Sequence, residues 1–203
     1  MKIICIGRNY AEHAREMKSE IPSEPVFFMK PDTALLKDGA PFYFPDFTSD
    51  LHHEIEIVLK ISKAGKCIEE KFAHKYYEEI GLGIDFTARD LQQRCKDKGL
   101  PWEKAKSFDH SAPIGSFVSK SKFSDLNHID FQLEINGETR QSGNTQNLLF
   151  SFDQIISFVS RFVTLKTGDL IFTGTPEGVG PVKRGDVLAG FLLNEKMLEV
   201  EVR

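Results

Sequence analysis

Acidic residues at two places in the chain have the type and spacing of a divalent-metal site. Glu54 and Glu56 are two residues apart in an alternating segment, 53–61, so a strand would place both carboxylates on one face. Asp85 ends an apolar segment, 80–86, just before an expected helix. Three carboxylates form an all-oxygen set that suits Mg²⁺, Mn²⁺ or Ca²⁺ better than Zn²⁺. From spacing alone, a solvent-exposed strand face is the favoured explanation of the glutamates, and Asp85 equally fits a helix-terminal acid.

A histidine and a glutamate near the N-terminus have the spacing of a general-base pair. His13 and Glu16 lie in a polar segment with one expected short helix, around residues 10–18. Residues three apart are neighbours on a helix. A carboxylate that accepts a hydrogen bond from one imidazole nitrogen fixes the tautomer and makes the other nitrogen more basic. From spacing alone, an ordinary surface pair remains the favoured explanation.

Basic residues that could balance the carboxylates are also present. Arg8 follows the first expected strand, Lys30 follows the second, and Lys106 lies in a segment without helical periodicity, expected to be a loop. Each alone is the kind of residue that is usually a surface charge. The glycine-rich loop 173–180, which contains Thr175, matches no phosphate-binding pattern. Its small residues either allow a ligand to approach the backbone closely or simply form a tight turn.

The strand signals predict a mainly β fold. Alternation predicts a half-buried strand over 53–61, and Asn136 followed by Gly137 predicts a type I′ turn in a hairpin over 130–142. Further strands are expected at 2–6, 26–29, 80–86 and 169–173, with a closing hairpin at the C-terminus. The strands do not alternate with helices as βαβ units would.

Two further helices are expected at the periphery. One covers about 88–98, with Thr87 and Asp90 as its capping box and Gly99 just beyond its end. The other covers about 152–163 and carries an apolar stripe of period 3.6. Its capping box would be Ser151 with Gln154.

Length, charge and cysteine content exclude several classes of protein. The chain has 203 residues, which predicts one domain. A net charge of −4 argues against nucleic-acid binding, and no apolar run is long enough to predict a membrane span. Three cysteines without a CxxC pair favour a reducing, cytoplasmic setting.

Seven motifs in order resemble a known family. They are GRNYAEHAREM, KPDTALL, LHHEIEI, GIDFTARDLQ, KGLPWEKAKSFD, NGETRQSGNT and GDLIFTGTPEGVGPVKRGD. Together they resemble the fumarylacetoacetate hydrolase superfamily across about residues 3–202, and within it most closely the compact acylpyruvate hydrolase and oxaloacetate decarboxylase branch. The resemblance implies a mixed β-sandwich roll (mainly β, α+β) with a few peripheral helices, a homodimer, and a Mg²⁺ or Mn²⁺ cofactor.

The resemblance also implies roles for individual residues. Glu54, Glu56 and Asp85 would be the metal ligands, and Lys106 would be the catalytic lysine beside the metal. His13 and Glu16 would form a dyad on a mobile active-site lid, residues 8–24, within a single catalytic domain, 1–203. The substrate would be surrounded by Arg8, Lys30, Gln92 and Thr175. The extra N-terminal domain of larger members is expected to be absent.

These roles predict a divalent-metal-dependent enzyme that cleaves small 2-oxo acids through a metal-bound pyruvate enolate. The reaction would be acylpyruvate C–C hydrolysis, oxaloacetate decarboxylation, or both. An oxaloacetate keto–enol tautomerase or a diketo-acid isomerase is an alternative that needs no bond cleavage. A divalent-ion-binding structural domain is the alternative without catalysis. The sequence does not choose the acyl group or between Mg²⁺ and Mn²⁺.

Overall fold

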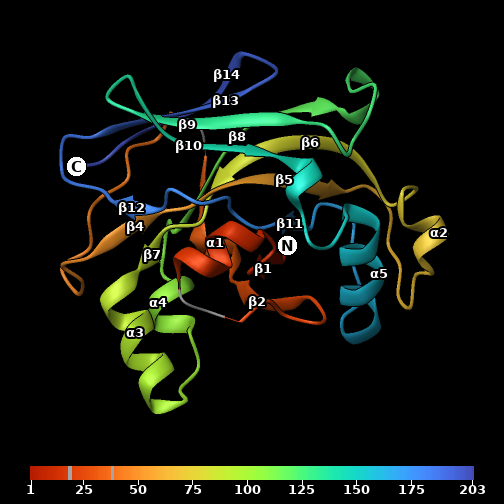
Figure 1. Cartoon of the computed structure of the whole chain (residues 1–203), viewed down its shortest axis with the longest axis horizontal. Helices are drawn as coiled ribbons and strands as arrows, with labels where there is room; N and C mark the ends of the chain where they lie inside the picture. Colours follow the sequence, from red (N-terminus) through yellow and green to blue (C-terminus); the bar gives the residue numbers. More distant parts are fainter. Residues whose placement is uncertain (18–19, 38) are drawn as a thin grey trace.

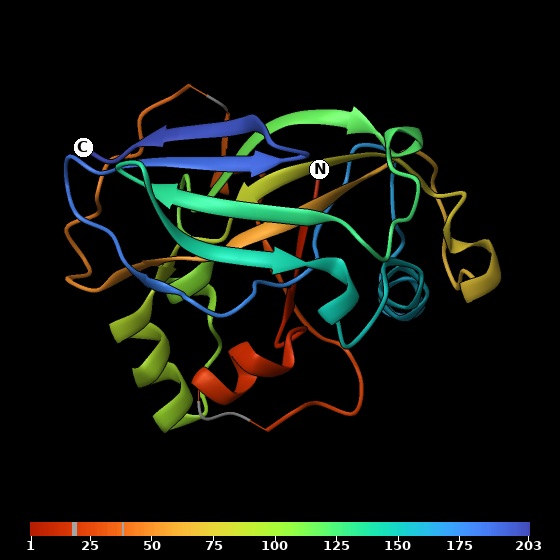
Figure 2. The same ribbon diagram turned by 45° about the horizontal axis from the view of Figure 1, so that its top comes forward.

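The computed structural model describes residues 1–17, 20–37 and 39–203. A seven-stranded sheet lies under a four-stranded sheet, and helices lie around their edges (Figures 1 and 2). The seven-stranded sheet has the order β2 (Val26–Lys30), β1 (Ile3–Gly7), β11 (Leu170–Phe172), β5 (Ile55–Ile61), β6 (Tyr77–Ile84), β8 (Ala112–Ser119) and β3 (Leu35–Lys37). The four-stranded sheet has the order β10 (Glu138–Asn144), β9 (Asp130–Ile135), β13 (Val187–Leu192) and β14 (Glu195–Glu201). A small third sheet joins β12 (Gly180–Pro181), β4 (Leu51–His53) and β7 (Thr87–Ala88).

The large sheet is mixed, as predicted. Strand β1 is parallel to β11 and β3 is parallel to β8, whereas the other neighbours are antiparallel. The helices are short and peripheral: α1 (Ala11–Glu16), α2 (Glu70–Ala73), α3 (Arg89–Lys98), α4 (Glu103–Lys106) and α5 (Phe152–Phe162). The prediction of a mainly β fold with few helices is therefore confirmed. No helix in the described ranges is long and apolar enough to cross a membrane.

The two sheets pack so closely that one face of β5 is given entirely to the core. Ile55 and Ile57 are fully buried in the main hydrophobic cluster, with Leu82 of β6. A Cβ added at Gly190 of β13 would lie 3.3 Å from the side chains of both Ile55 and Leu82. Side chains alternate along a strand, so Glu56 projects from the opposite face of β5, away from the four-stranded sheet.

Several local predictions are confirmed by the backbone and its hydrogen bonds. Helix α5 begins with both halves of the capping box formed by Ser151 and Gln154. Asn136 and Gly137 have φ of 54° and 81°, as a type I′ turn requires. Gly99 ends α3 in the left-handed region, at φ 62°. These signals are local, so tertiary packing had little opportunity to override them.

Three local predictions are wrong. Residues 53–61 do not form one half-exposed strand: the chain breaks at Glu54, and β5 is buried on both faces because further side chains cover its second face. Thr87 does not cap α3: its hydroxyl donates to the Asp85 carbonyl, and Asp90 accepts hydrogen bonds from Thr48 Oγ1 and the Leu91 amide. Lys106 lies in the short helix α4 rather than in a loop.

A buried ion pair joins the start of β1 to the start of β11. Asp169 accepts hydrogen bonds from the side chain and amide of Lys2 and from the amide of Lys166. Burial opposes ionisation, but these hydrogen bonds outweigh it and hold the pKa of Asp169 below its ordinary value. The ionised carboxylate therefore stabilises the fold above about pH 4, the ordinary aspartate pKa, and this contribution is lost as the pH falls further.

We expect Asp169→Asn to lower the free energy of unfolding by about 2 kcal/mol at pH 7, and by clearly less at pH 3. Urea denaturation at both pH values measures this difference. Asp46→Asn, at a fully exposed carboxylate, is the matched control and should change stability little. A loss from Asp169→Asn that is as large at pH 3 as at pH 7 would contradict the ion-pair account.

Candidate metal centre and active site

Sheet register brings the three predicted carboxylates together. Strands β5 and β6 are antiparallel with Ile55 opposite Ile84, and the Asp85 amide donates to the Glu54 carbonyl at 2.8 Å. Glu54 therefore lies beside Asp85, and Glu56 projects from the same face as Glu54. One carboxylate oxygen from each residue lies within 4.8 Å of the others. All three side chains are buried, with at most 6% of the residue exposed.

The charge of this cluster fits a divalent cation. Burial, and then the charges of Asp85 and Glu54, raise the pKa of Glu56 well above its ordinary value. Glu56 Oε2 accepts from the Gly174 amide at 2.6 Å, a neutral donor and the only one to Glu56 among the residues that the structure describes. Three oxygens this close and this poorly compensated around Glu56 are a suitable set for Mg²⁺ or Mn²⁺.

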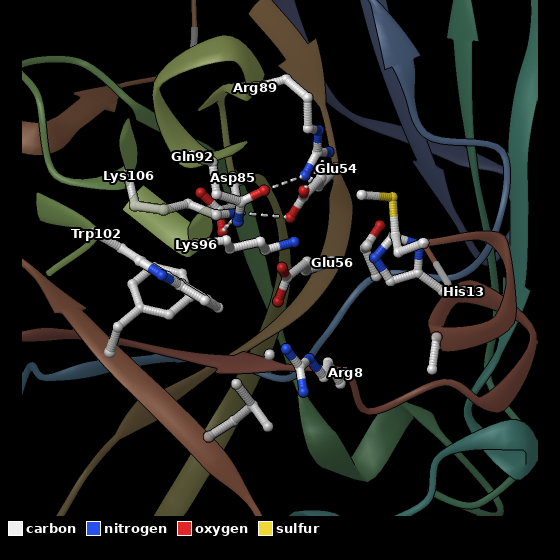
Figure 3. A pocket seen from close by; sticks show the side chains of 16 residues that line it. Arg8, His13, Glu54, Glu56, Asp85, Arg89, Gln92, Lys96, Trp102 and Lys106 are labelled. Atoms are coloured by element: carbon white, nitrogen blue, oxygen red, sulfur yellow. Dashed lines mark hydrogen bonds and ion pairs between the residues drawn. The ribbon is translucent and has the colours of Figure 1, made fainter. Parts of the chain in front are cut away.

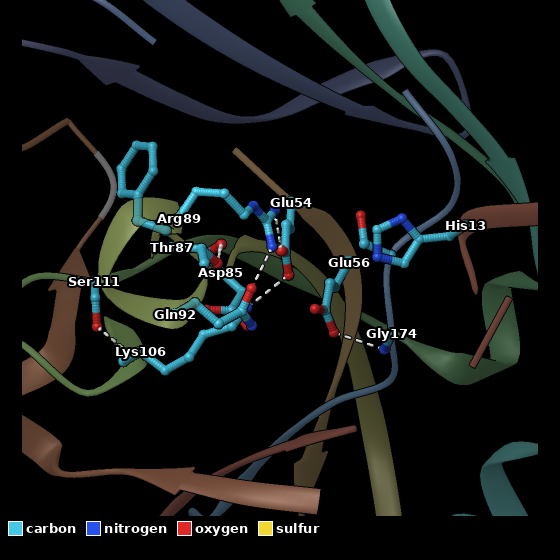
Figure 4. A network of polar contacts seen from close by, with 12 residues as sticks. His13, Glu54, Glu56, Asp85, Thr87, Arg89, Gln92, Lys106, Ser111 and Gly174 are labelled. Carbon is cyan, nitrogen blue, oxygen red and sulfur yellow. Dashed lines mark hydrogen bonds and ion pairs between the residues drawn. The ribbon is translucent and has the colours of Figure 1, made fainter. Parts of the chain in front are cut away.

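Lys106 bridges two of the three carboxylates. Its Nζ lies 2.8 Å from Glu54 Oε2 and 2.7 Å from Asp85 Oδ2 (Figure 4). Burial disfavours the ammonium, but Asp85 and Glu54 outweigh burial and raise the pKa of Lys106. Burial likewise opposes ionisation of Glu54, but Lys106 and Arg89 outweigh it and hold the pKa of Glu54 well below its ordinary value.

Lys30 lies behind Asp85 rather than on the cavity wall. Its Nζ is 2.8 Å from Asp85 Oδ1 and also donates to the carbonyl and hydroxyl of Ser111. It is completely enclosed, so this position suits the orientation of Asp85 rather than contact with a substrate.

The structure brings His13 and Glu16 into hydrogen-bond distance on α1. His13 Nδ1 is 3.1 Å from Glu16 Oε2, and Glu16 Oε1 accepts from the Gly178 amide at 3.1 Å. A proton on Nδ1 shared with Glu16 leaves Nε2 as the basic nitrogen. His13 and Lys106 lie on opposite sides of Glu56 (Figures 3 and 4).

Most of the predicted site residues line one cavity beside the carboxylates (Figure 3). These are Arg8, His13, Glu54, Glu56, Asp85, Gln92, Lys106 and Thr175. Of the remaining two, Glu16 lies behind His13 and Lys30 behind Asp85. The Thr175 hydroxyl donates to the Ile55 carbonyl at 2.8 Å, so this residue fastens the glycine-rich loop to β5.

Among the cavity-wall residues that sequence reasoning missed are Arg89, Lys96 and Trp102. Arg89 donates to Glu54 Oε1 at 2.7 Å and to Gln92 Oε1 at 2.8 Å. The missed signal was the spacing of Arg89, Gln92 and Lys96, which places them on one face of α3. No sequence signal identified Trp102, whose position depends on packing.

The segment predicted as a lid, 8–24, is firmly held at its start. Asn9 is fully buried; its amide donates to the carbonyls of Thr173 and Phe150, and its oxygen accepts from the Phe150 amide. A Cβ at Gly174, where φ is +104°, would lie 2.7 Å from Asn9 Cβ, so the loop must be glycine there. Helix α1 follows and covers the cavity, and residues 18–19 of the predicted lid lie outside the described residues.

The sequence matches one known protein family over almost its whole length. The family described as "Fumarylacetoacetate (FAA) hydrolase C-terminal" matches residues 2–201. This chain belongs to that family. The family predicted from the motifs and the mixed β fold are thereby confirmed.

Relatives within the family are close in sequence and structure. The chain is 50% identical over 184 residues to "Oxaloacetate tautomerase FAHD1, mitochondrial" of Bos taurus, covering 91% of this chain and 83% of that protein. It is 45% identical over 188 residues to "Oxaloacetate decarboxylase, mitochondrial" of Dictyostelium discoideum, covering 92% and 86%. The solved fumarylpyruvate hydrolase from Pseudomonas aeruginosa, in complex with Mn²⁺ and pyruvate, superposes with a TM-score of 0.93 at 40% identity. That superposition covers 100% of this chain and 89% of the hydrolase.

We expect Glu56→Gln to lower Mn²⁺ affinity by more than about 100-fold, because even outer-shell partners of metal ligands cost 10–100-fold. Electron paramagnetic resonance of free Mn²⁺ during a titration measures the affinity. Glu138→Gln, at an exposed glutamate of β10, is the matched control and should bind like the unsubstituted protein. Equal Mn²⁺ affinity in the two variants would remove Glu56 from the site.

Proposed function

We propose that this protein is a divalent-metal-dependent enzyme that enolises small 2-oxo acids, with oxaloacetate as its main substrate. The observation that carries the proposal is the buried carboxylate cluster of Glu54, Glu56 and Asp85, bridged by Lys106 and faced by His13. The relatives named as oxaloacetate tautomerase and decarboxylase support this choice of substrate. The family membership makes an enzyme a better explanation than an ion-binding structural domain.

The chain's own residues have distinct parts in this reaction. Glu54, Glu56 and Asp85 would hold the cation, and Arg89 and Lys30 would keep two of these carboxylates oriented. Bound Mg²⁺ or Mn²⁺ would supply Lewis-acid polarisation of the substrate's 2-oxo group. The Lys106 ammonium adds positive charge where negative charge develops on the substrate, an electrostatic effect that is already organised before reaction.

His13 is the proposed general base, oriented by Glu16. In tautomerisation its Nε2 takes a proton from C3 of oxaloacetate, and a proton returns to the oxygen of the enol. In decarboxylation the C3–C4 bond breaks, CO₂ leaves, and C3 later gains a proton, so no base is needed for the bond-breaking step. One cavity can thus support both reactions, with His13 essential for only the first.

Acylpyruvate hydrolysis is a second candidate function. The fumarylpyruvate hydrolase that superposes over the whole chain favours it. Here His13 would take a proton from a water molecule that attacks the C4 carbonyl, after which the C3–C4 bond breaks to give pyruvate and a carboxylic acid. Arg8, Gln92 and Thr175 lie around this cavity and would contact the substrate.

We also propose that residues 8–24 act as a lid on a single catalytic domain, 1–203. Asn9 would be the fixed end, and the contact from Glu16 to the Gly178 amide would be made when the lid is closed. Amide hydrogen exchange at residues 11–17 should slow when Mg²⁺ and oxalate are added. Exchange that is equally slow with and without them would contradict a lid.

Two further proposals concern the whole molecule. We propose a cytoplasmic setting, which the three free cysteines support, and a homodimer, which the family resemblance supports. Light scattering coupled to size-exclusion chromatography tests the dimer, and a monomeric mass would contradict it.

A panel of substrates tests the proposed function directly. Oxaloacetate, acetylpyruvate and fumarylpyruvate are incubated with Mg²⁺, with Mn²⁺ or with EDTA, following loss of the oxaloacetate enol and release of pyruvate. We expect metal-dependent turnover of oxaloacetate, and pyruvate from the acylpyruvates if the second function also holds. Stabilisation by Mg²⁺ without turnover of any substrate would instead favour an ion-binding structural domain.

We expect His13→Ala to slow tautomerisation and acylpyruvate hydrolysis by about 10²–10⁴-fold, the usual contribution of a general base. Decarboxylation should fall much less, because its bond-breaking step needs no base. Comparing kcat for the three reactions measures this split, with His128→Ala at an exposed histidine as the control. Equal losses in all three reactions would show that His13 is not simply a base.

A further inference from the structure

The cations of the cavity fall into two groups. Lys106 and Arg89 each contact a carboxylate of the cluster, and Lys30 contacts Asp85 from behind. Three cations therefore already pair with two of the carboxylates, Glu54 and Asp85. Arg8 and Lys96 also line the cavity, but among the described residues neither has a hydrogen-bond acceptor or an ion-pair partner. These two positive charges therefore remain available to a bound ligand.

Lys96 is directed into the cavity by the helix that carries it. It lies seven residues after Arg89 on α3, which places both side chains on one face. Its ammonium lies over the Trp102 ring, 5.8 Å from the ring centre. Figure 3 shows the side chain reaching from α3 toward Glu56, on the same wall as Gln92 and Lys106.

This position is unfavourable for an unpaired ammonium. Partial burial, followed by the nearby charges of Arg89 and Arg8, lowers the pKa of Lys96. An exposed lysine on the far side of α3 would avoid this cost. An anion that binds beside Lys96 and Arg8 would relieve both the desolvation and the repulsion.

We propose that Lys96, together with Arg8, binds the distal carboxylate of a dianionic 2-oxo acid and makes the enzyme prefer dicarboxylates to monocarboxylic analogues. This inference rests on the proposed function, in which the other end of the substrate lies at the carboxylate cluster. A 2-oxo acid with one carboxylate would leave Arg8 and Lys96 without a partner. Oxaloacetate supplies a second carboxylate, whereas acetylpyruvate has an acetyl group at the corresponding carbon.

A kinetic comparison measures this preference. The quantity is the ratio of kcat/KM for oxaloacetate to kcat/KM for acetylpyruvate, at saturating Mg²⁺. Lys96→Met should lower the ratio by about 10- to 100-fold, the scale of a lost hydrogen bond between charged groups, and Lys96→Arg should restore most of it. Lys98→Met, on the same helix but exposed and outside the cavity wall, should leave the ratio as it is. An unchanged ratio in Lys96→Met would overturn the proposal, and so would a loss that Lys96→Arg does not recover.

A binding measurement tests the same subsite without turnover. Trp102 is the only tryptophan of the chain and lies next to Lys96, so its fluorescence should report binding. The probes are (S)-malate and (S)-2-hydroxybutyrate, two unreactive acids that differ only in a carboxylate in place of a methyl group. The protein should bind malate at least about 10-fold more tightly, and Lys96→Met should abolish this preference.

The two measurements separate failure of the subsite from failure of the proposed function. A malate preference that depends on Lys96, in a protein that turns over none of the substrates, would support the subsite and contradict the enzymatic function. Turnover of oxaloacetate together with a malate preference that survives in Lys96→Met would support the enzyme and overturn the role of Lys96.

Discussion

Repulsion among three buried carboxylates is the constraint around which the rest of the site is arranged. Their oxygens lie within 4.8 Å of one another in a nearly dry environment, where like charges are costly. Glu54 and Asp85 are compensated by Lys106, Arg89 and Lys30. Within residues 1–17, 20–37 and 39–203, Glu56 accepts a hydrogen bond only from a backbone amide. The arrangement is favourable once a divalent cation is shared by all three, and this requirement explains why so many basic side chains point toward one end of β5.

One loop connects the carboxylate cluster to the proposed base. Within residues 173–178, the Gly174 amide donates to Glu56 and the Gly178 amide donates to Glu16. Asn9 fastens the start of α1 to the same loop through the Thr173 carbonyl. The loop thus fixes a proposed metal ligand at one end and orients the histidine dyad at the other. The glycines at 174 and 178 have φ of +104° and +90°, conformations that favour glycine.

The sequence predicted those parts of the site that depend on local spacing. The face shared by Glu54 and Glu56 follows from strand periodicity, and the contact between His13 and Glu16 follows from helix periodicity. Burial of Glu54 and Glu56 could not be predicted from local spacing, because it depends on the elements that cover β5. The approach of Asp85 depends on the register between β5 and β6, which no single segment specifies. Lys96 and Trp102 are in contact only because α3 and α4 pack together, so neither residue could be assigned to the site from its own segment.

Crystals grown or soaked with Mn²⁺ show, through the anomalous scattering of the ion, whether the three carboxylates bind one cation. We expect one strong anomalous peak bounded by carboxylate oxygens of Glu54, Glu56 and Asp85. A peak elsewhere, with Glu54 and Asp85 still paired with Lys106, Arg89 and Lys30 and no ion beside Glu56, would show that these carboxylates are not the metal ligands.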